Sequence, residues 1–441
     1  MFRFQPLEAR DNLMSVGPTA NGTRLLSMTK RLRSPLLVVL ILSALISVVF
    51  LKALPDRFRQ NEETDYFFSY EPIARNFMAG QGLSRDGEHL ATEYPPGYSL
   101  ILAAIYSGSN LLGVSEDAAL SAFAVICMAL VSMFVFLLAR MFWGTLPALI
   151  SALVWMTYPF GLWLTKQPNS ELPFMVVLYG GFCLFWYALS RRLPARVYFL
   201  CGLIFGAAML IRPIAMGVGL VLSVLVWFTR REMSRRTRGV MIAMLLVGSL
   251  IAILPWEAWV YHKTGQVIPL GSNGVKSMRD GLTFAAWSKG YREEGNTSPD
   301  VLQVMENIRA HEEEISTFGD FRSVMSREFR DHPVGMTKLL LLKLGRSWYG
   351  TDSKRMETPI LLIQLAYLLL VGWGAWNAWK RGGKYRGLVI GVLLITVYFW
   401  GMTFLALSIL RYLVPVVGLL FVLVAGCYPR RLRTELKPAT T

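Results

Sequence analysis

Cysteine and histidine are scarce in this chain, which has only four of each among 441 residues. The cysteines form no CxxC pair, have no histidine partner close by in the sequence, and all lie in apolar segments: Cys127, Cys183, Cys201 and Cys427. This pattern argues against a redox or metal role for them. We interpret them as small apolar packing residues.

Charge is scarce as well, since only 17% of the residues are charged while 54% are hydrophobic and the mean hydropathy is +0.43. Soluble domains carry more charge and less apolar surface. The apolar residues form ten blocks, most with the roughly 20 residues that cross about 30 Å of hydrocarbon. The sequence therefore predicts an all-α polytopic membrane protein with about 10 transmembrane helices. The predicted spans are 35–54, 116–139, 144–164, 172–190, 197–212, 213–229, 238–257, 358–379, 387–405 and 410–428.

Basic residues cluster in alternate connections, and the positive-inside rule places such connections in the cytoplasm. They hold 23 of the 45 basic residues but only 4 of the 29 acidic ones. The segments are 3–33, Arg140, 190–196, 229–238, 379–386 and 428–437. We expect both termini to be cytoplasmic. The net charge of +16 is then explained by the basic cytoplasmic connections and their contact with anionic membrane lipids. We therefore expect no nucleic-acid partner.

Two connections on the opposite, outer side are long, and no internal repeat is visible in the chain. In 55–115 we predict a helix over 66–79, ended by glycines, and an interfacial helix over 98–113. In 258–357 we predict a small helical periplasmic cap and a second interfacial helix. The expected domains are a cytoplasmic basic tail (1–34), an N-terminal transmembrane module (35–257) whose first outer loop (55–115) is catalytic, the cap (258–357), C-terminal transmembrane helices (358–428) and a cytoplasmic tail (429–441).

Several short motifs follow one another in this frame: an acidic residue opening the first outer loop, YPPGY at 94–98, SELPF at 170–174, LIRP at 210–213, PWEAWVYHKTGQ at 255–266 and RYLVP at 411–415. In this order the chain resembles glycosyltransferase family 39 of the GT-C superfamily, which includes protein mannosyltransferases and the lipid A aminoarabinose transferase. The resemblance covers about residues 60–425. It implies a GT-C fold and the transfer of a sugar from a polyprenyl-phosphate donor to an acceptor on the outer face.

Such a transfer needs a base for the acceptor hydroxyl and positive charge for the departing phosphate. Asp65 opens the first outer loop, and the matching aspartate has the role of base in the family. The alternative is that Asp65 is the N-cap of the following helix. Glu62, Glu63 and Glu71 are the neighbouring carboxylates. Many family members show an acidic pair where this chain has one aspartate, which leaves the need for a divalent cation open.

Arg212 lies between the two shortest spans, so its turn should be recessed in the membrane, where a charge is costly and usually functional. Its planar fork suits a lipid phosphate, but it would equally suit a pair with Glu171 or Glu257. Arg411, at the outer end of the last span, is a phosphate ligand or an interfacial residue paired with Tyr412. Lys166 is a third phosphate candidate or an ordinary loop lysine.

The remaining site candidates are predicted to line the substrate pocket. Glu171, which begins the fourth span, caps its helix or orients a sugar hydroxyl. Tyr94 and Tyr98 flank the diproline turn and are expected to wall the donor pocket. Glu93 and His262 are weak candidates for holding a divalent cation, because an isolated histidine at a membrane edge usually serves packing.

We interpret the chain as an inverting glycosyltransferase of the bacterial inner membrane, with its active site on the periplasmic face. Its expected partners are a polyprenyl-phosphate sugar and a lipid, glycan or protein acceptor. A lipid-linked glycan polymerase or ligase is the nearest alternative among enzymes. A non-catalytic transporter or scaffold is the other, although a transporter would normally show paired repeats.

Overall fold

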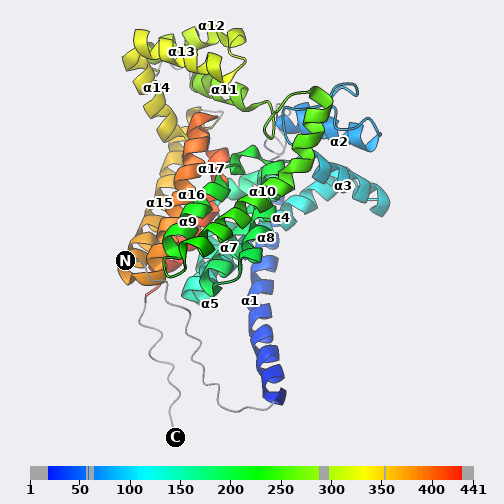
Figure 1. The fold of residues 1–441 in the computed structure, drawn as a ribbon, viewed down its shortest axis with the longest axis vertical. Coiled ribbons are helices and arrows are strands. Elements are labelled where there is room, and N and C mark those ends of the chain that lie inside the picture. The colour runs from blue at the N-terminus through cyan, green and yellow to red at the C-terminus, as the bar shows by residue number, and fades with distance from the viewer. Residues whose placement is uncertain (1–17, 56–57, 59–63, 288–296, 352–353, 430–441) are drawn as a thin grey trace.

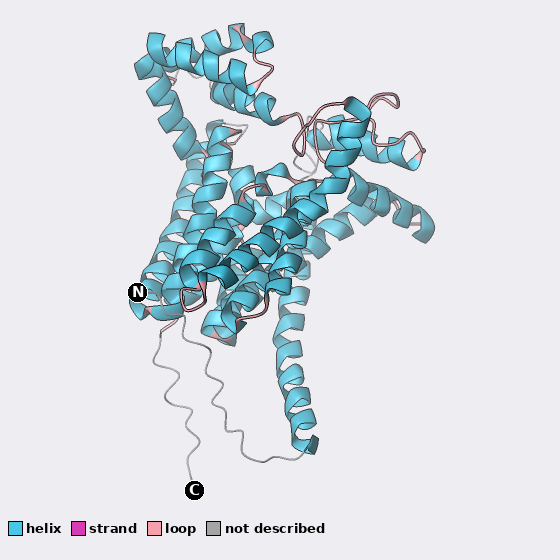
Figure 2. Ribbon diagram, in the orientation of Figure 1, coloured by secondary structure: helices cyan, strands magenta, loops and turns pink. Residues whose placement is uncertain are grey.

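The computed structural model describes residues 18–55, 58, 64–287, 297–351 and 354–429. These residues form helices joined by loops, with one isolated antiparallel bridge between Ser84 and Leu90 (Figure 2). The predicted all-α class is therefore confirmed. Residues 1–17 and 430–441 of the two predicted tails lie outside the described residues.

Seven helices in the described part of the chain are long and apolar enough to cross a membrane, which is the signature of a polytopic membrane protein. They correspond to seven of the ten predicted spans. α1 begins at Pro18, inside the segment predicted as a tail, and only its part from Ser34 is apolar enough for a span. The seven are α1 (Pro18–Ala53), α4 (Glu116–Trp143), α7 (Glu171–Arg191), α10 (Arg235–Thr264), α15 (Lys354–Arg381), α16 (Gly383–Leu405) and α17 (Leu410–Phe421), which continues as η6 (Val422–Cys427).

The span predicted over 144–164 is broken in the structure. α5 (Thr145–Met156) is followed by α6 (Pro159–Trp163) and η3 (Leu164–Lys166), and the two parts differ in direction by 52°. The break falls at Tyr158, whose backbone is extended because the next residue is proline. A proline that ends one helix can begin another, so one apolar block gives two helices.

The spans predicted over 197–212 and 213–229 are present as the short helices α8 (Ala195–Ile211) and α9 (Val218–Thr229), joined by η4 (Pro213–Ala215). α8 packs against α10 at very close range. A Cβ atom on Gly202 would lie only 2.1 Å from the carbonyl oxygen of Leu245. Glycine is therefore required for the two backbones to meet at this point.

The helices differ in how far they are buried, and this difference indicates which ones face lipid. The helical run of α17 and η6 is 83% buried and forms the centre of the bundle, where the Tyr179 hydroxyl donates to the carbonyl of Pro415 at 2.9 Å. α1 buries Val39 and bonds Ser43 to Ser132 of α4, yet Ile41 and Leu45 remain 66% and 57% exposed. Large apolar side chains exposed along whole helices are stable in a bilayer and costly in water.

Both long connections lie at one end of the bundle, which we call the loop end (Figure 1). The first connection contains a helix over the predicted range, which the structure divides into η2 (Tyr66–Tyr70) and α2 (Glu71–Met78), and the helix predicted over 98–113, which is α3 (Gly97–Leu112). Figure 1 shows α3 projecting from the side of the bundle rather than running along it.

The second connection folds into the predicted helical cap, which has a small apolar core of its own built on Val304, Met305, Ile308 and Met336. One of its helices, α11, was not predicted. Two of the three basic residues of α14 are buried rather than facing the interface, with Lys343 2% and Arg346 1% exposed, whereas the side chain of Lys338 is 49% exposed. The cap helices are α11 (Gly274–Trp287), α12 (Pro299–Ala310), α13 (Phe318–Asp331) and α14 (Pro333–Arg346), with η5 (Glu312–Glu314) between α12 and α13.

Candidate active site

Three charged residues from distant parts of the chain meet at the loop end, and we call them the arginine centre: Glu171, Arg212 and Arg411. Glu171 is fully buried, and its Oε1 atom lies 3.0 Å from Nη1 of Arg212. Arg411 binds the same carboxylate in a bidentate manner, through Nε to Oε1 and through Nη2 to Oε2 at 3.1 Å. One carboxylate thus holds two guanidinium groups, and the centre has a net charge of +1.

Each member of the arginine centre occupies a helix terminus. Glu171 is the first residue of α7, and Arg212 follows the last residue of α8 with an extended backbone because Pro213 comes next. Arg411 is the second residue of α17. The guanidinium of Arg212 lies over the ring of Tyr412, 5.0 Å from its centroid, and donates to the Ser170 hydroxyl at 2.7 Å. Three helix ends therefore place these side chains together.

Asp65 lies immediately before η2, a single turn of π-helix in which Glu71 N–H bonds to the carbonyl of Tyr66. Its side chain makes no capping hydrogen bond, so the structure gives no support to the N-cap alternative. Instead its Oδ1 accepts a hydrogen bond from the Tyr94 hydroxyl at 3.2 Å. Isolated π-turns inside helices occur frequently at functional sites.

Tyr70 is buried and close enough to both Asp65 and Arg212 for their charges to act on its phenol, and sequence reasoning did not single it out. Burial raises the pKa of its phenol, the nearby charge of Arg212 opposes this rise, and the charge of Asp65 adds to it. Its ring lies 4.9 Å, centroid to centroid, from both Tyr94 and Tyr98. The only sequence signal was its position five residues after Asp65, which a π-turn brings to the same side of the helix.

The segment that follows α10 also reaches this site. Asn273 donates to the Tyr94 hydroxyl at 2.9 Å, and the backbone N–H of Ser272 donates to the carbonyl of Thr92 at 2.8 Å. Burial and the charge of Asp65 both raise the pKa of Tyr94. Asn273 is a second site residue that the sequence did not indicate, because nothing local distinguishes it from other loop asparagines.

Some predicted site residues lie apart from these groups. Glu93 contacts Ser69 at 3.5 Å and Arg85 at 3.4 Å. Lys166 places its Nζ atom 4.4 Å from the ring centroid of Trp163. His262 is exposed on the last turn of α10, and no hydrogen bond or ion pair joins it to Glu93 among the described residues.

The other carboxylates considered as base or partner also have defined positions. Glu257 accepts a hydrogen bond from the backbone of Leu270 at 2.7 Å, and Arg212 pairs with Glu171. Glu71 pairs with Arg75, while Glu62 and Glu63 lie outside the described residues. Within the described residues, no group of three or more His, Cys, Asp or Glu side chains is arranged to hold a metal ion.

The arrangement combines a cationic centre with a nearby carboxylate. Glu171 has no exposed surface and serves to hold the arginines, whereas the side chain of Arg411 is 34% exposed and can reach a ligand. Asp65 lies near this cationic centre, since its charge and that of Arg212 both act on the Tyr70 phenol. The site can therefore neutralise a phosphate on one side and accept a proton on the other.

Residues 93–259 match the family model for dolichyl-phosphate-mannose-protein mannosyltransferase. No curated protein and no solved structure matches the chain. The family match supports a membrane glycosyltransferase of the GT-C type, and it implies a lipid-linked sugar donor together with an acceptor.

The matched segment is less than half of the chain, and it divides the site. Glu171 and Arg212 fall inside it, together with Tyr94. Asp65 and Arg411 fall outside it, so their positions are supported by the structure, which brings them to the matched residues.

Proposed function

We propose that this protein is an inverting glycosyltransferase that moves a sugar from a polyprenyl-phosphate donor to a hydroxyl group of an acceptor. The observation that carries the proposal is the arginine centre beside Asp65. Two arginines sharing one buried carboxylate retain a positive charge for a phosphate. Among the described residues, the Asp65 carboxylate accepts one hydrogen bond, from the Tyr94 hydroxyl to Oδ1. In the proposed reaction its second oxygen receives the substrate proton.

The proposed reaction is a single displacement. The acceptor oxygen attacks the anomeric carbon on the face opposite the phosphate, and Asp65 takes the hydroxyl proton. The bond from the anomeric carbon to the phosphate oxygen breaks, and its electron pair leaves with the polyprenyl phosphate. Arg212 and Arg411 stabilise the charge that develops on this phosphate. One displacement inverts the configuration at the anomeric carbon.

The proposal also assigns the loop end to the periplasmic face of a bacterial inner membrane. Basic residues gather at the opposite ends of the helices, including Arg191 at the end of α7 and Arg381 at the end of α15. Basic connections stay on the cytoplasmic side. A donor delivered to the outer leaflet would then enter the site from the membrane.

The test is sugar transfer from a panel of radiolabelled polyprenyl-phosphate monosaccharides by the purified full-length protein, with a lipid extract as acceptor. We expect turnover of one donor, and a loss of about 10²–10⁴-fold in Asp65→Asn, because this is the usual contribution of a general base. Glu88→Gln is the matched control, since Glu88 is an exposed carboxylate of the same loop.

Equal turnover by wild type and Asp65→Asn would contradict the role of Asp65 and direct attention to Glu71 or Glu93. Absence of turnover with every monosaccharide donor would contradict the proposed reaction. An oligosaccharide donor, as used by a polymerase or ligase, and transport without chemistry would then be tested next.

A further inference from the structure

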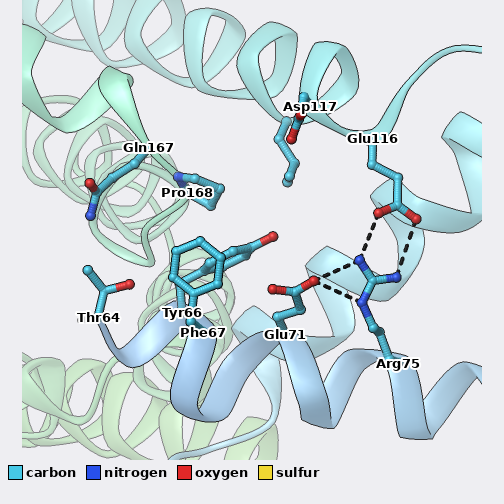
Figure 3. Close-up of a pocket in the computed structure, with 10 residues that line it drawn as sticks. Thr64, Tyr66, Phe67, Glu71, Arg75, Glu116, Asp117, Gln167 and Pro168 are labelled. Atoms are coloured by element: carbon cyan, nitrogen blue, oxygen red, sulfur yellow. Dashed lines mark hydrogen bonds and ion pairs between the residues drawn. The ribbon is translucent and has the colours of Figure 1, made fainter. Parts of the chain in front are cut away.

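A cavity of about 150 Å³ lies beside η2, on the side where α4 begins and where the loop before α7 passes (Figure 3). Two pairs of its lining residues are close in sequence to residues of the candidate active site. Thr64 and Tyr66 flank Asp65, and Gln167 and Pro168 precede Ser170 by a few residues. The other lining residues are Phe67, Glu71, Arg75, Glu116, Asp117 and Leu120.

The cavity is anionic, in contrast to the arginine centre. It has three carboxylates, from Glu71, Glu116 and Asp117, and one cation, Arg75, which gives a net charge of −2. Arg75 donates to Glu71 through Nε at 2.8 Å and to Glu116 through Nη2 at 2.8 Å. Figure 3 shows Glu71 and Asp117 on opposite sides of the space. A phosphate would be repelled here.

The cavity wall has polar groups that can bond a ligand, namely one hydroxyl, one amide oxygen and one carboxylate. The Thr64 hydroxyl and the Gln167 Oε1 atom are buried and have no hydrogen-bond partner among the described residues. Asp117 likewise makes no hydrogen bond or ion pair within the described parts of the chain, and it is exposed. Buried acceptors are costly unless a donor reaches them. The groups that fit such a wall are hydroxyls.

The wall also contains apolar surface suited to a sugar ring. The rings of Tyr66 and Phe67 line the space together with Leu120 and Pro168. An aromatic body with polar neighbours can pack against the apolar face of a sugar while its hydroxyls are bonded. At about 150 Å³ the cavity is smaller than the roughly 300 Å³ at which pockets for drug-sized ligands begin, which suits one sugar unit.

We propose that this cavity binds a neutral, hydroxyl-rich sugar unit of the acceptor, and this rests on the proposed glycosyltransferase function. The donor sugar is bonded to a phosphate and must lie where Arg212 and Arg411 neutralise that charge. The acceptor has no such constraint. The opposite charges of the cavity and the arginine centre thus separate the acceptor from the donor, and Asp65 adjoins the cavity through its neighbours Thr64 and Tyr66.

The test measures binding and turnover separately in the full-length protein in nanodiscs. Binding is measured by saturation-transfer NMR with methyl α-mannopyranoside as the neutral probe and mannose 6-phosphate as the anionic one. We expect the neutral glycoside to bind and the phosphate to bind more weakly. Asp117→Asn removes one charged acceptor and should weaken binding of the neutral probe by about three- to tenfold. Glu88→Gln is the control and should bind as wild type does.

In the transfer assay, Asp117→Asn should raise KM for the acceptor while leaving the slow hydrolysis of the donor without acceptor unchanged. A rise in KM for the donor, or loss of that hydrolysis, would overturn the proposal by assigning the cavity to the donor sugar. Equal glycoside binding by wild type and Asp117→Asn, or a preference for the phosphate, would also overturn it. If no donor is turned over, the proposed function fails, while the binding measurements still decide whether the cavity holds a neutral sugar.

Discussion

At the scale of single residues, Glu171 decides how the site is built. Its carboxylate is fully buried and is the partner of both Arg212 and Arg411. The sequence identified all three residues but left open the role of each one. From the sequence, Glu171 was a candidate helix cap or sugar ligand. The structure instead shows a carboxylate that holds two guanidinium groups. The predicted roles of the arginines toward a phosphate stay predictions.

Removal of this carboxylate should therefore be costly. Glu171→Gln leaves two guanidinium groups without their counter-ion, and we expect a loss of about 3 kcal/mol in the free energy of unfolding, because breaking a buried ion pair typically costs that much. The measurement is thermal unfolding in detergent, followed by intrinsic fluorescence. Glu93→Gln, in which a partly exposed carboxylate with weak contacts is replaced, should change stability by less than about 1 kcal/mol. Similar losses in both variants would contradict the structural role of Glu171.

At the scale of elements, the start of α3 fixes the position of the first loop over the arginine centre. A Cβ atom on Gly97 would lie 2.5 Å from the carbonyl oxygen of Leu210, near the end of α8. The glycine of the YPPGY motif is thus needed for close approach. It lets the tyrosines on either side, Tyr94 and Tyr98, lie next to the turn that presents Arg212. The sequence predicted a diproline turn here but not what it packs against.

Gly97→Ala should therefore separate α3 from α8. We expect sugar transfer to fall by about tenfold or more, since misplacing catalytic groups by about 1 Å can cost 100-fold in rate. Gly108→Ala is the matched control in the same helix, because a Cβ atom there would meet nothing within 4 Å. That substitution should leave transfer unchanged and raise stability slightly through helix propensity. Equal activity of the two variants would show that the close approach is unimportant.

At the scale of the whole molecule, the cap is attached to the turn between α16 and α17, which precedes Arg411. The Lys343 ammonium of α14 donates to the carbonyl of Gly281 in α11 at 2.7 Å and to that of Ala406 after α16 at 3.0 Å. The backbone N–H of Leu410 donates to the carbonyl of Gly350 at 2.9 Å. These contacts connect the cap to the segment that leads into Arg411.

The contribution of Lys343 to the free energy of unfolding should depend on pH. Burial, with a further contribution from Arg346, lowers the pKa of Lys343 from 10.5 to about 7. Between these values the unfolded chain binds a proton that the folded chain does not, so the free energy of unfolding rises with pH. Below about pH 7 both states bind it, and this contribution no longer changes. We expect wild type to gain stability from Lys343 over this range, measured as the midpoint of thermal unfolding at several pH values.

Lys343→Met should lose that rise, whereas Lys338→Met, on the exposed side of the same helix, should keep it. The difference between the two variants removes the contributions of other titrating groups. Parallel pH profiles for wild type and Lys343→Met would mean that Lys343 stays protonated in the folded protein throughout.

The sequence alone predicted the helical class, seven helices long enough to span a membrane and the two long connections, and it singled out Glu171, Arg212 and Arg411 as candidates. These properties depend on local composition and length, which a single segment carries by itself. It did not determine the bend between α5 and α6, the additional cap helix α11, or the part that Tyr70 and Asn273 play beside Asp65.

Only the tertiary structure decided which charges meet. Glu171 and Arg411 are 240 residues apart, and Arg212 comes from a third helix end. Hydrophobicity places each helix in the membrane but does not specify its neighbours, because lipid and apolar side chains are equally good environments for an apolar helix face. The ion pairs and the anionic cavity depend on how the helix ends pack together, and that is a property of the folded chain.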